Sequence, residues 1–265
     1  MKTKFSIRSQ FIPRKGNIFL AMDLSQAESW IVAFSAREDN MKHALQHEDI
    51  HTLTASILFD KEKANVTKEE RYIGKRCNHA LSYRMSANRL FEIFNKDAQT
   101  TGVQLTLQQA KRYRTRWHEF YNISIWWGEI EIALNNNART ILNAYGWPRT
   151  FYGRWGDELL KKATAHIPQS SVAFHTNGAI HPELGIEGGW LGIHKWAKKN
   201  KGCFLVHHGH DSLMLEIPKN RENDIAPEVK PILERPLIIN GEQFTIPVEV
   251  ECGDRWGELQ ELKVA

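Results

Sequence analysis

Cysteine is scarce in this chain of 265 residues, and the chain has no long apolar run. The three cysteines, Cys77, Cys203 and Cys252, are an odd number at wide spacing without a CxxC pair, so neither a disulfide framework nor a cysteine zinc site is indicated. No apolar stretch approaches the length of a membrane span, and the N-terminus is too polar for a signal peptide. We therefore expect an intracellular, cytoplasmic protein without a membrane partner.

Internal repeats and low-complexity segments are also absent. Hydrophobic residues make up 42% of the chain and charged residues 25%, which is typical of a globular protein with one or two domains. The net charge is +4, and basic residues gather near the start and between Arg71 and Arg76. A polyanionic partner fits this charge, but many proteins that never bind nucleic acid are equally basic.

A short pattern at residues 47–51 matches the HExxH spacing of zinc proteases. On one helix, His47 and His51 would point the same way, and Glu48 would polarise a metal-bound water. The pattern predicts a zinc hydrolase. It is short enough to recur by chance, and the chain offers no convincing third zinc ligand, so this function stays a minor alternative.

The N-terminal half begins with one predicted strand and is mostly helical in pattern beyond it. The segment NIFLAMDLSQAESWIVAFSA predicts a strand over residues 18–22, a turn, and a helix from about Gln26. Residues 40–144 are mostly helical in pattern, with three bulky core candidates, Trp117, Trp126 and Trp127. The best internal boundary follows, where the helical pattern is broken by Gly146, Pro148 and Gly153.

The C-terminal part returns to strands after one more helix. The segment ATAHIPQSSVAFHTNGAI is helical in pattern despite Pro168. Two hairpins are then predicted, one in CFLVHHGHDSLMLEI and one around Asn240-Gly241. We expect an α+β fold in which both ends of the chain form a β-rich platform and a helical block is inserted between them.

Two aspartates follow predicted strands. Asp23 ends the first strand, and Asp211 lies in the turn of the first hairpin. If these strands are neighbours, the carboxylates form the oxygen-rich pair that a two-magnesium site for phosphoryl transfer needs. Either residue alone has a simpler explanation, because Asp23 can cap the following helix and Asp211 can favour a turn.

A basic row recurs every four residues in RYIGKRCNHALSYRMSA: Arg71, Lys75, His79 and Tyr83. On a helix this row forms one stripe, and the like charges of Arg71 and Lys75 cost stability unless an anion lies over them. A triphosphate is such an anion. The alternative is a solvated basic face with Tyr83 at the edge of the core.

Together these segments resemble a known family. MDLSQAESWIVAFSA, RYIGKRCNHALSYRMSA and HHGHDSLMLEI are similar, in order and spacing, to polymerase motifs A, B and C of the family A DNA polymerases, the bacterial DNA polymerase I type and its phage relatives. Flanking stretches agree with the family: SIRSQFIP, EDIHTLTASILF, GWPRTFYGR, IPQSSVA and VECGDRWGE. A similarity along the whole chain is far more specific than HExxH.

The resemblance implies a right-hand polymerase palm, an antiparallel sheet with helices, carrying an inserted helical fingers subdomain. We expect residues 1–37 and 151–265 to form the palm and residues 38–150 the fingers. The family's thumb and exonuclease would precede this portion. The resemblance therefore implies a split or truncated polymerase, active alone or after joining a separate N-terminal chain that supplies the thumb and exonuclease, in the nucleoid or an infected host cell.

The implied reaction is Mg²⁺-dependent, template-directed nucleotidyl transfer from a dNTP to a primer 3′-OH. Asp23 and Asp211 would hold two Mg²⁺ ions with the backbone carbonyl of Leu24. Nucleotide contacts are implied for Gln26, Glu28, His51, Arg71, Lys75, His79 and Tyr83, among which Glu28 is the steric gate against ribose. Contacts with primer-template DNA are implied for Arg154, Gln169 and His210.

Several residues depart from the family pattern. His79 stands where the family has Phe or Tyr, and Ser212 replaces the glutamate after the second catalytic aspartate. Further departures are Leu24 for Tyr, Ser29-Trp30 for Leu-Arg, and Ala80 and Arg84 for glycines. These changes leave open a catalytically degenerate palm-fingers module that binds primer-template DNA or a replication partner.

Overall fold

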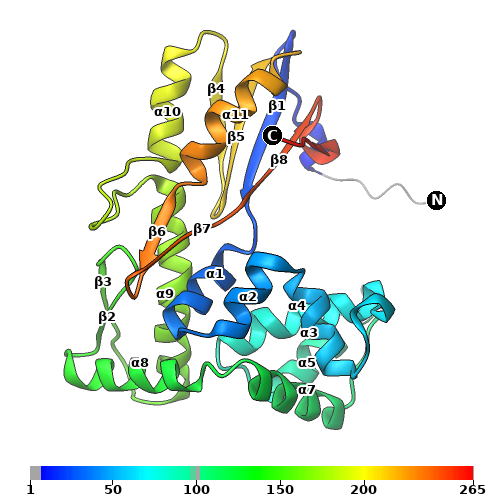
Figure 1. Cartoon of the computed structure of the whole chain (residues 1–265), viewed down its shortest axis with the longest axis vertical. Helices are drawn as coiled ribbons and strands as arrows, with labels where there is room; N and C mark the ends of the chain where they lie inside the picture. Colours follow the sequence, from blue (N-terminus) through cyan, green and yellow to red (C-terminus); the bar gives the residue numbers. More distant parts are fainter. Residues whose placement is uncertain (1–6, 97, 99–101, 265) are drawn as a thin grey trace. The chain divides into compact units, whose positions relative to one another are not determined.

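A computed structural model describes residues 7–96, 98 and 102–264, and they form two compact units (Figure 1). The sheet unit comprises the described residues up to Ala27, residues 144–146 and residues from Gln169 onward. The helical unit comprises residues 28–143 and 147–168. No helix in the described ranges is both long enough and apolar enough to cross a lipid bilayer.

The sheet unit is built on five antiparallel strands in the order β4-β5-β1-β8-β9. Their bounds are β1 (Asn17–Leu24), β4 (Phe204–His208), β5 (Ser212–Pro218), β8 (Val248–Gly253) and β9 (Gln260–Glu261). The central strand β1 pairs with β5 on one side and β8 on the other. The predicted α+β class and the first predicted hairpin, β4–β5, are confirmed.

Alternating side chains give the sheet two different faces. Leu20, Met22 and Leu24 of β1 are buried, while Asp23 between them is exposed. Successive strand residues point to opposite faces, so the apolar set packs under the helices and the polar set lies on the other face. Helix α11 (Glu222–Leu233) packs against β1 and β8, and α10 (Gly189–Lys199) packs against β4. The open face is therefore free to carry polar side chains.

Shorter elements complete the sheet unit. Strands β6 (Pro236–Ile239) and β7 (Glu242–Thr245) form the second predicted hairpin. Its two turn residues, Asn240 and Gly241, both have positive φ (53° and 77°), which the right-handed twist of a two-residue hairpin requires. Two short 3₁₀ helices, η1 (Arg8–Gln10) and η3 (Trp256–Glu258), lie side by side near the chain ends.

Most of the helices in the described residues lie in the helical unit. They are α1 (Ala27–Ala36), α2 (Asp39–His47), α3 (Ile50–Phe59), η2 (Lys63–Asn65), α4 (Lys68–Ser82), α5 (Ala87–Lys96), α7 (Leu107–Phe120) and α8 (Ser124–Asn136). A small hairpin, β2 (Thr140–Leu142) and β3 (Pro148–Thr150), follows. Helix α9 (Asp157–Asn177) continues through Pro168, as predicted, and its two halves belong to different units.

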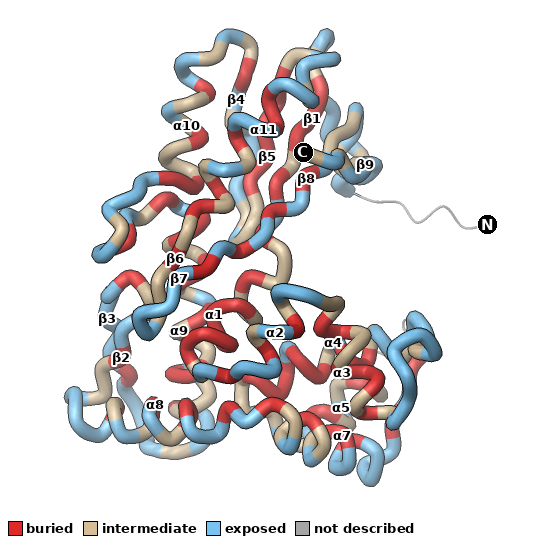
Figure 2. The backbone as a smooth tube through the Cα atoms, in the orientation of Figure 1, coloured by how far each residue is buried: buried red, intermediate tan, exposed pale blue. Residues whose placement is uncertain are grey.

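Helices α3, α4 and α7 share a core with a polar centre (Figure 2). Trp117 is fully buried, and its indole Nε1 donates to Asn78 Oδ1 at 2.8 Å. The same oxygen accepts from Thr54 Oγ1 at 2.9 Å. A buried amide satisfied in this way fixes the relative positions of three helices, because an unpaired polar group here would cost about 1–3 kcal/mol.

Candidate functional site

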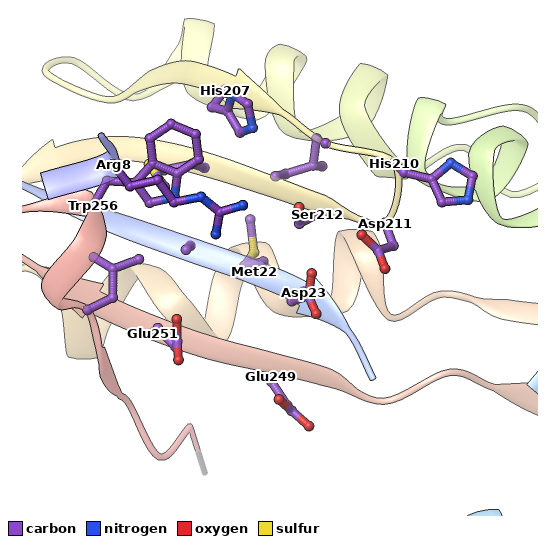
Figure 3. Close-up of a pocket in the computed structure, with 15 residues that line it drawn as sticks. Arg8, Met22, Asp23, His207, His210, Asp211, Ser212, Glu249, Glu251 and Trp256 are labelled. Atoms are coloured by element: carbon purple, nitrogen blue, oxygen red, sulfur yellow. The ribbon is translucent and has the colours of Figure 1, made fainter. Parts of the chain in front are cut away.

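The sheet brings the two predicted catalytic aspartates to adjacent strand ends (Figure 3). Asp23 near the end of β1 is paired in register with Ser212, the first residue of β5. The backbone N–H of Leu24 donates to the backbone oxygen of Asp211 at 3.0 Å. The strands that carry the two residues are therefore neighbours, as the sequence analysis required. The role of these carboxylates in metal binding stays a prediction.

Strand β8 adds carboxylates that the sequence analysis missed. Glu249 is paired with Asp23 across β1 and β8, and its Oε1 accepts from Ser25 Oγ at 2.8 Å. Glu251 lies two residues along the same strand, opposite Ala21. Directly paired residues project from the same face of a sheet. The alternation in VEVE predicts that Glu249 and Glu251 share a face, but it does not identify the strand beside them.

A cavity of about 450 Å³ lies along this face. Its lining includes Asp23, Asp211, Ser212, Glu249 and Glu251. In the part of the chain that the structure describes, no group of three or more His, Cys, Asp or Glu side chains is placed to hold a metal ion. Mg²⁺ is usually bound by one or two carboxylates together with substrate phosphates and water, so the aspartate pair fits a magnesium ion that is completed by substrate.

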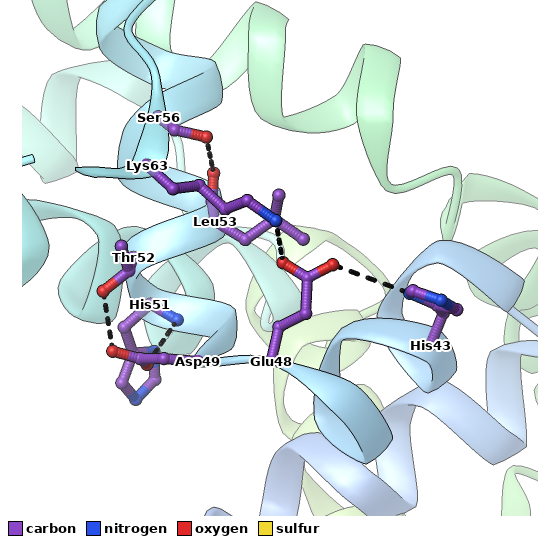
Figure 4. Close-up of polar contacts among 8 residues, drawn as sticks. All are labelled: His43, Glu48, Asp49, His51, Thr52, Leu53, Ser56 and Lys63. Carbon is purple, nitrogen blue, oxygen red and sulfur yellow. Dashed lines mark hydrogen bonds and ion pairs between the residues drawn. The ribbon is translucent and has the colours of Figure 1, made fainter. Parts of the chain in front are cut away.

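The HExxH segment does not form one helix (Figure 4). His47 ends α2, Glu48 is the cap residue that follows it, and His51 belongs to α3. Asp49 begins the new helix, since its carboxylate accepts from the backbone N–H of His51 at 3.1 Å. The Glu48 carboxylate is bound by Lys63 Nζ at 2.5 Å. The geometry predicted for a zinc hydrolase is therefore wrong.

Helix α4 presents the predicted basic row to solvent. Arg71, Lys75 and His79 are exposed at successive turns. Arg71 Nε donates to Asp49 Oδ2 at 2.5 Å, whereas Lys75 is in no ion pair with any described residue. Burial alone would raise the pKa of Asp49, but hydrogen bonds from Arg71 and Thr52 and the backbone of His51 outweigh it and lower the pKa to about 2. An anion of the protein already compensates Arg71.

His51 lies beneath this row rather than on it. Its side chain is 7% exposed, and its Nδ1 is 3.3 Å from Asn78 Nδ2. The pKa of His51 is lowered to about 4, chiefly by burial; the charge of Asp49 opposes the shift, and those of Arg71 and Lys75 add to it. The imidazole is consequently neutral at pH 7, so any contact with phosphate comes from a hydrogen bond and not from a positive charge.

This buried imidazole gives a pH prediction. The folded-state pKa of His51 is below the unfolded value, so the unfolded chain binds a proton first and stability falls as pH falls from about 6.5 towards 4. From pH 7 to pH 5 this one group should lower the free energy of unfolding by roughly 2 kcal/mol. Urea denaturation at both pH values should show a smaller pH difference for His51→Asn than for the wild type. His47→Asn, at an exposed position of α2, is the control, and equal pH differences in His51→Asn and the wild type would contradict the prediction.

Two of the predicted nucleotide-contact residues, Tyr83 and His79, lie beside the carboxylate of a third, Glu28. Tyr83 OH donates to Glu28 Oε2, and His79 Nδ1 is 4.0 Å from the same oxygen. The His79 and Tyr83 rings are perpendicular with centroids 5.4 Å apart. Burial raises the pKa of Tyr83, with the charge of Glu28 acting in the same direction, so the phenol is a hydrogen-bond donor at pH 7. Glu28 is thereby held in a fixed position.

The remaining predicted contacts are distributed over both units. Gln26 lies in the turn after β1 with a left-handed backbone (φ 54°), and its Oε1 is buried without a hydrogen-bond partner among the described residues. His210 lines the cavity beside Asp211. Arg154 of the helical unit and Gln169 of the sheet unit are both exposed. Their contacts with DNA stay predictions.

The sequence as a whole matches a described family. Residues 1–144 match the family model described as DNA polymerase family A, which is more than half of the chain. The chain belongs to DNA polymerase family A. The predicted resemblance is therefore confirmed, and the two aspartates lie at the adjacent strand ends of a family A polymerase sheet.

Individual relatives show the same likeness over nearly the whole chain. DNA polymerase I of Helicobacter pylori (strain 26695) is 29% identical over 96% of this chain and 27% of its own length. That of Aquifex aeolicus is 28% identical over 94% of this chain and 41% of its own length, and that of Borreliella burgdorferi is 26% identical over 96% and 26%. The chain thus spans between about a quarter and two fifths of these family A relatives.

A solved structure shares the fold. The POL domain of Pol1 from M. smegmatis, in complex with DNA primer-template and dNTP, superimposes with a TM-score of 0.73 at 22% identity. The match covers 94% of this chain and 42% of that one. The polymerase fold predicted for this family A chain is confirmed by this likeness.

Proposed function

We propose that this chain carries out template-directed DNA synthesis as part of a family A DNA polymerase. The observation that carries the proposal is the pairing of β1 with β5, which places Asp23 and Asp211 at adjacent strand ends on the cavity. The relatives are DNA polymerases I, and the solved neighbour binds primer-template DNA and dNTP, so we take these as the ligands here.

The proposed reaction joins the primer 3′ oxygen to the α-phosphorus of a dNTP. The bond from that phosphorus to the bridging oxygen breaks, pyrophosphate leaves with the electron pair, and the hydroxyl proton passes to water. Two Mg²⁺ ions, when bound, supply the charge that makes the 3′-OH acidic and neutralises pyrophosphate. Asp23, Asp211 and the backbone carbonyl of Leu24 would hold them, since all three offer the hard oxygen ligands that Mg²⁺ prefers.

The helical unit would bind the nucleotide. Lys75 and Arg71 present positive charge along one exposed face of α4, which suits the phosphates of a dNTP. Glu28, fixed by Tyr83, would fill the space beside the sugar C2′ and exclude a ribose hydroxyl. His79 beside them would stack on the sugar or base. Template sequence would be read by base pairing, so protein contacts with DNA should be sensitive to salt and tolerant of sequence.

Because Arg71 is paired with Asp49, substitutions of Lys75 and Arg71 should affect the KM for dNTP to different extents. Lys75→Ala should raise the KM for dNTP about ten- to hundredfold, because it removes one charge-assisted hydrogen bond of roughly 1.5–3 kcal/mol. Arg71→Ala should raise KM less, since Arg71 must first leave Asp49 to bind phosphate. Steady-state incorporation measures both values. Lys68→Ala, at an exposed lysine of the same helix, is the control, and a larger effect for Arg71→Ala would contradict the prediction.

A direct test is the extension of a labelled primer on a recessed template by one nucleotide. The proposed function predicts incorporation of only the dNTP complementary to the template base, with dependence on Mg²⁺ at low salt. We also propose that full activity requires the rest of a family A polymerase, supplied on the same polypeptide or by an N-terminal partner chain. The assay is therefore run with the chain alone and with an added N-terminal polymerase fragment, and no incorporation in either mixture would reject synthesis.

A second function is favoured by one residue. Ser212 follows Asp211 where the family has a glutamate, so a carboxylate of the metal site is lost. A degenerate module would bind primer-template DNA with an affinity that Mg²⁺ and dNTP do not change. It would incorporate no nucleotide, either alone or with the added N-terminal polymerase fragment. Ser212→Glu, which restores this carboxylate, should not restore synthesis if the module also lacks other groups that catalysis needs.

A further inference from the structure

The cavity on the open face of the sheet has a second end, formed by Arg8, Trp256 and His207 (Figure 3). The Arg8 guanidinium lies over the Trp256 indole, 5.1 Å from the ring centroid, and the His207 ring is 4.6 Å from the same indole. Phe11 packs against the indole from η1, with ring centroids 5.5 Å apart. One aromatic ring thus holds a cation and an imidazole at the wall of the cavity.

This arrangement is stabilised by hydrogen bonds between the segments that carry Arg8 and Trp256. The backbone N–H of Trp256 donates to the backbone oxygen of Phe11 at 3.2 Å, and Arg255 Nη1 donates to the backbone oxygen of Ser9 at 3.0 Å. The 3₁₀ helices that carry Arg8 and Trp256 are therefore joined directly. The backbone of Arg8 is thereby held beside Trp256, and its guanidinium is held by contact with the indole.

The strand register gives the position of this end relative to the aspartates. The row that includes His207 continues across four strands through Met214, Ala21 and Glu251. Asp23 lies two residues from Ala21 on β1, and a strand rises about 3.4 Å per residue, so the rows are about 7 Å apart. One DNA strand rises about 3.4 Å per nucleotide along the helix axis. For a primer strand that runs along β1, the two rows are consequently about two nucleotide steps apart.

The charge of Arg8 is available to a ligand. Among the described residues Arg8 is in no ion pair, and its guanidinium is held over an aromatic face that leaves its N–H groups to donate elsewhere. The carboxylate of Glu251 lines the same cavity, so a free anion would meet repulsion there. A chain of phosphates held at several points tolerates that repulsion, and its sugars offer an apolar surface to Trp256 and His207.

We propose that Arg8, Trp256 and His207 form a subsite for the primer strand, in which Arg8 binds one of the first two phosphodiester linkages from the 3′ end. The deoxyribose beside that linkage lies against Trp256 and His207. The subsite rests on the proposed function, because the primer 3′ end is placed at Asp23 and Asp211. Its role is to fix the register of the primer, which positions the 3′ oxygen for attack.

Primer-template affinity, measured by fluorescence anisotropy in EDTA without dNTP, tests the subsite independently of catalysis. Arg8→Ala should weaken binding about five- to tenfold at low salt and reduce the slope of log affinity against log salt by about 0.9, the value for one phosphate. Lys15→Ala removes an equal charge from the same unit outside the cavity and should have a smaller effect. Equal losses for the two variants would overturn the subsite.

Primers with a single neutral methylphosphonate linkage then locate the contact. The Arg8→Ala loss should disappear when the first or second linkage is neutral and should persist when the fourth is neutral. A loss that is the same with every primer means general electrostatic attraction and rejects the subsite. If that loss is position-specific but no nucleotide is ever incorporated, the subsite stands and the proposed synthesis fails. If the wild type extends primers and Arg8→Ala has no positional effect, only the subsite fails.

Discussion

Asp23→Asn and Asp211→Asn should each lower the rate of single-nucleotide incorporation by at least about a thousandfold, which corresponds to roughly 4 kcal/mol of transition-state stabilisation. The reason is the position of both carboxylates at the adjacent ends of β1 and β5. Asparagine retains the shape and one oxygen, but it lacks the negative charge that opposes two divalent cations. The rate is best measured in a single turnover with saturating primer-template, so that binding is not limiting.

Two further measurements separate lost chemistry from lost structure. Asp254→Asn removes an exposed carboxylate of the same unit, one that is bound by Lys219 at 2.9 Å, and it should keep nearly the wild-type rate. Primer-template affinity in EDTA should not fall in Asp23→Asn, since losing this carboxylate removes only a repulsion of the phosphates. A rate above about a tenth of the wild type in either catalytic variant would show that the proposed metal site is wrong.

Ser212 makes this experiment more informative than in a chain with the usual glutamate. Ser212 is paired with Asp23 in register, and Glu249 is paired with Asp23 from the other side. The row across three strands therefore retains a second carboxylate, although on β8 rather than β5. This arrangement favours the catalytic function over the degenerate one, because the sheet keeps its acidic row despite the substitution.

The sequence predicted where the strands of the site lie better than it predicted which strands pair with one another. The β4–β5 hairpin was predictable because two apolar strands flank a short polar turn, and such a contact is local. The pairing of β1 with β8 joins Asp23 to Glu249, more than two hundred residues away, and no local pattern specifies it. Glu249 was missed for this reason. The alternation in VEVE indicates only which residues share its face, because the register between distant strands is fixed only by the folded sheet.

The HExxH segment failed for a different physical reason. A helix through residues 47–51 competes with a new helix that begins at Asp49, whose carboxylate satisfies the backbone N–H of His51. Aspartate is strongly favoured at such a cap, so the signal was present in the sequence. The burial of His51 was harder to predict from the sequence, because it depends on the buried Asn78 of α4, which belongs to another segment.

Gly74→Ala should destabilise the helical unit by about 2 kcal/mol or more. Gly74 lies in the middle of α4, where α3 crosses closely, and a Cβ there would overlap the backbone oxygen of His51 and contact Ala55. Backbone atoms cannot rotate away as a side chain does, so the helices must separate. The expected result is a lower urea midpoint, measured by circular dichroism.

Gly128→Ala is the matched control, since Gly128 lies within α8 and a Cβ there meets no atom within 4 Å. Alanine is the better helix former, so this variant should gain about 0.5–1 kcal/mol. Opposite signs for one and the same chemical change would show that contact between α3 and α4, and not helix propensity, requires Gly74. Equal midpoints would contradict that account.

The separation of α3 and α4 in Gly74→Ala would also move Asp49 of the α3 cap away from Arg71 of α4. Gly74→Ala should therefore change dNTP affinity as well as stability, whereas Gly128→Ala should leave dNTP affinity unchanged.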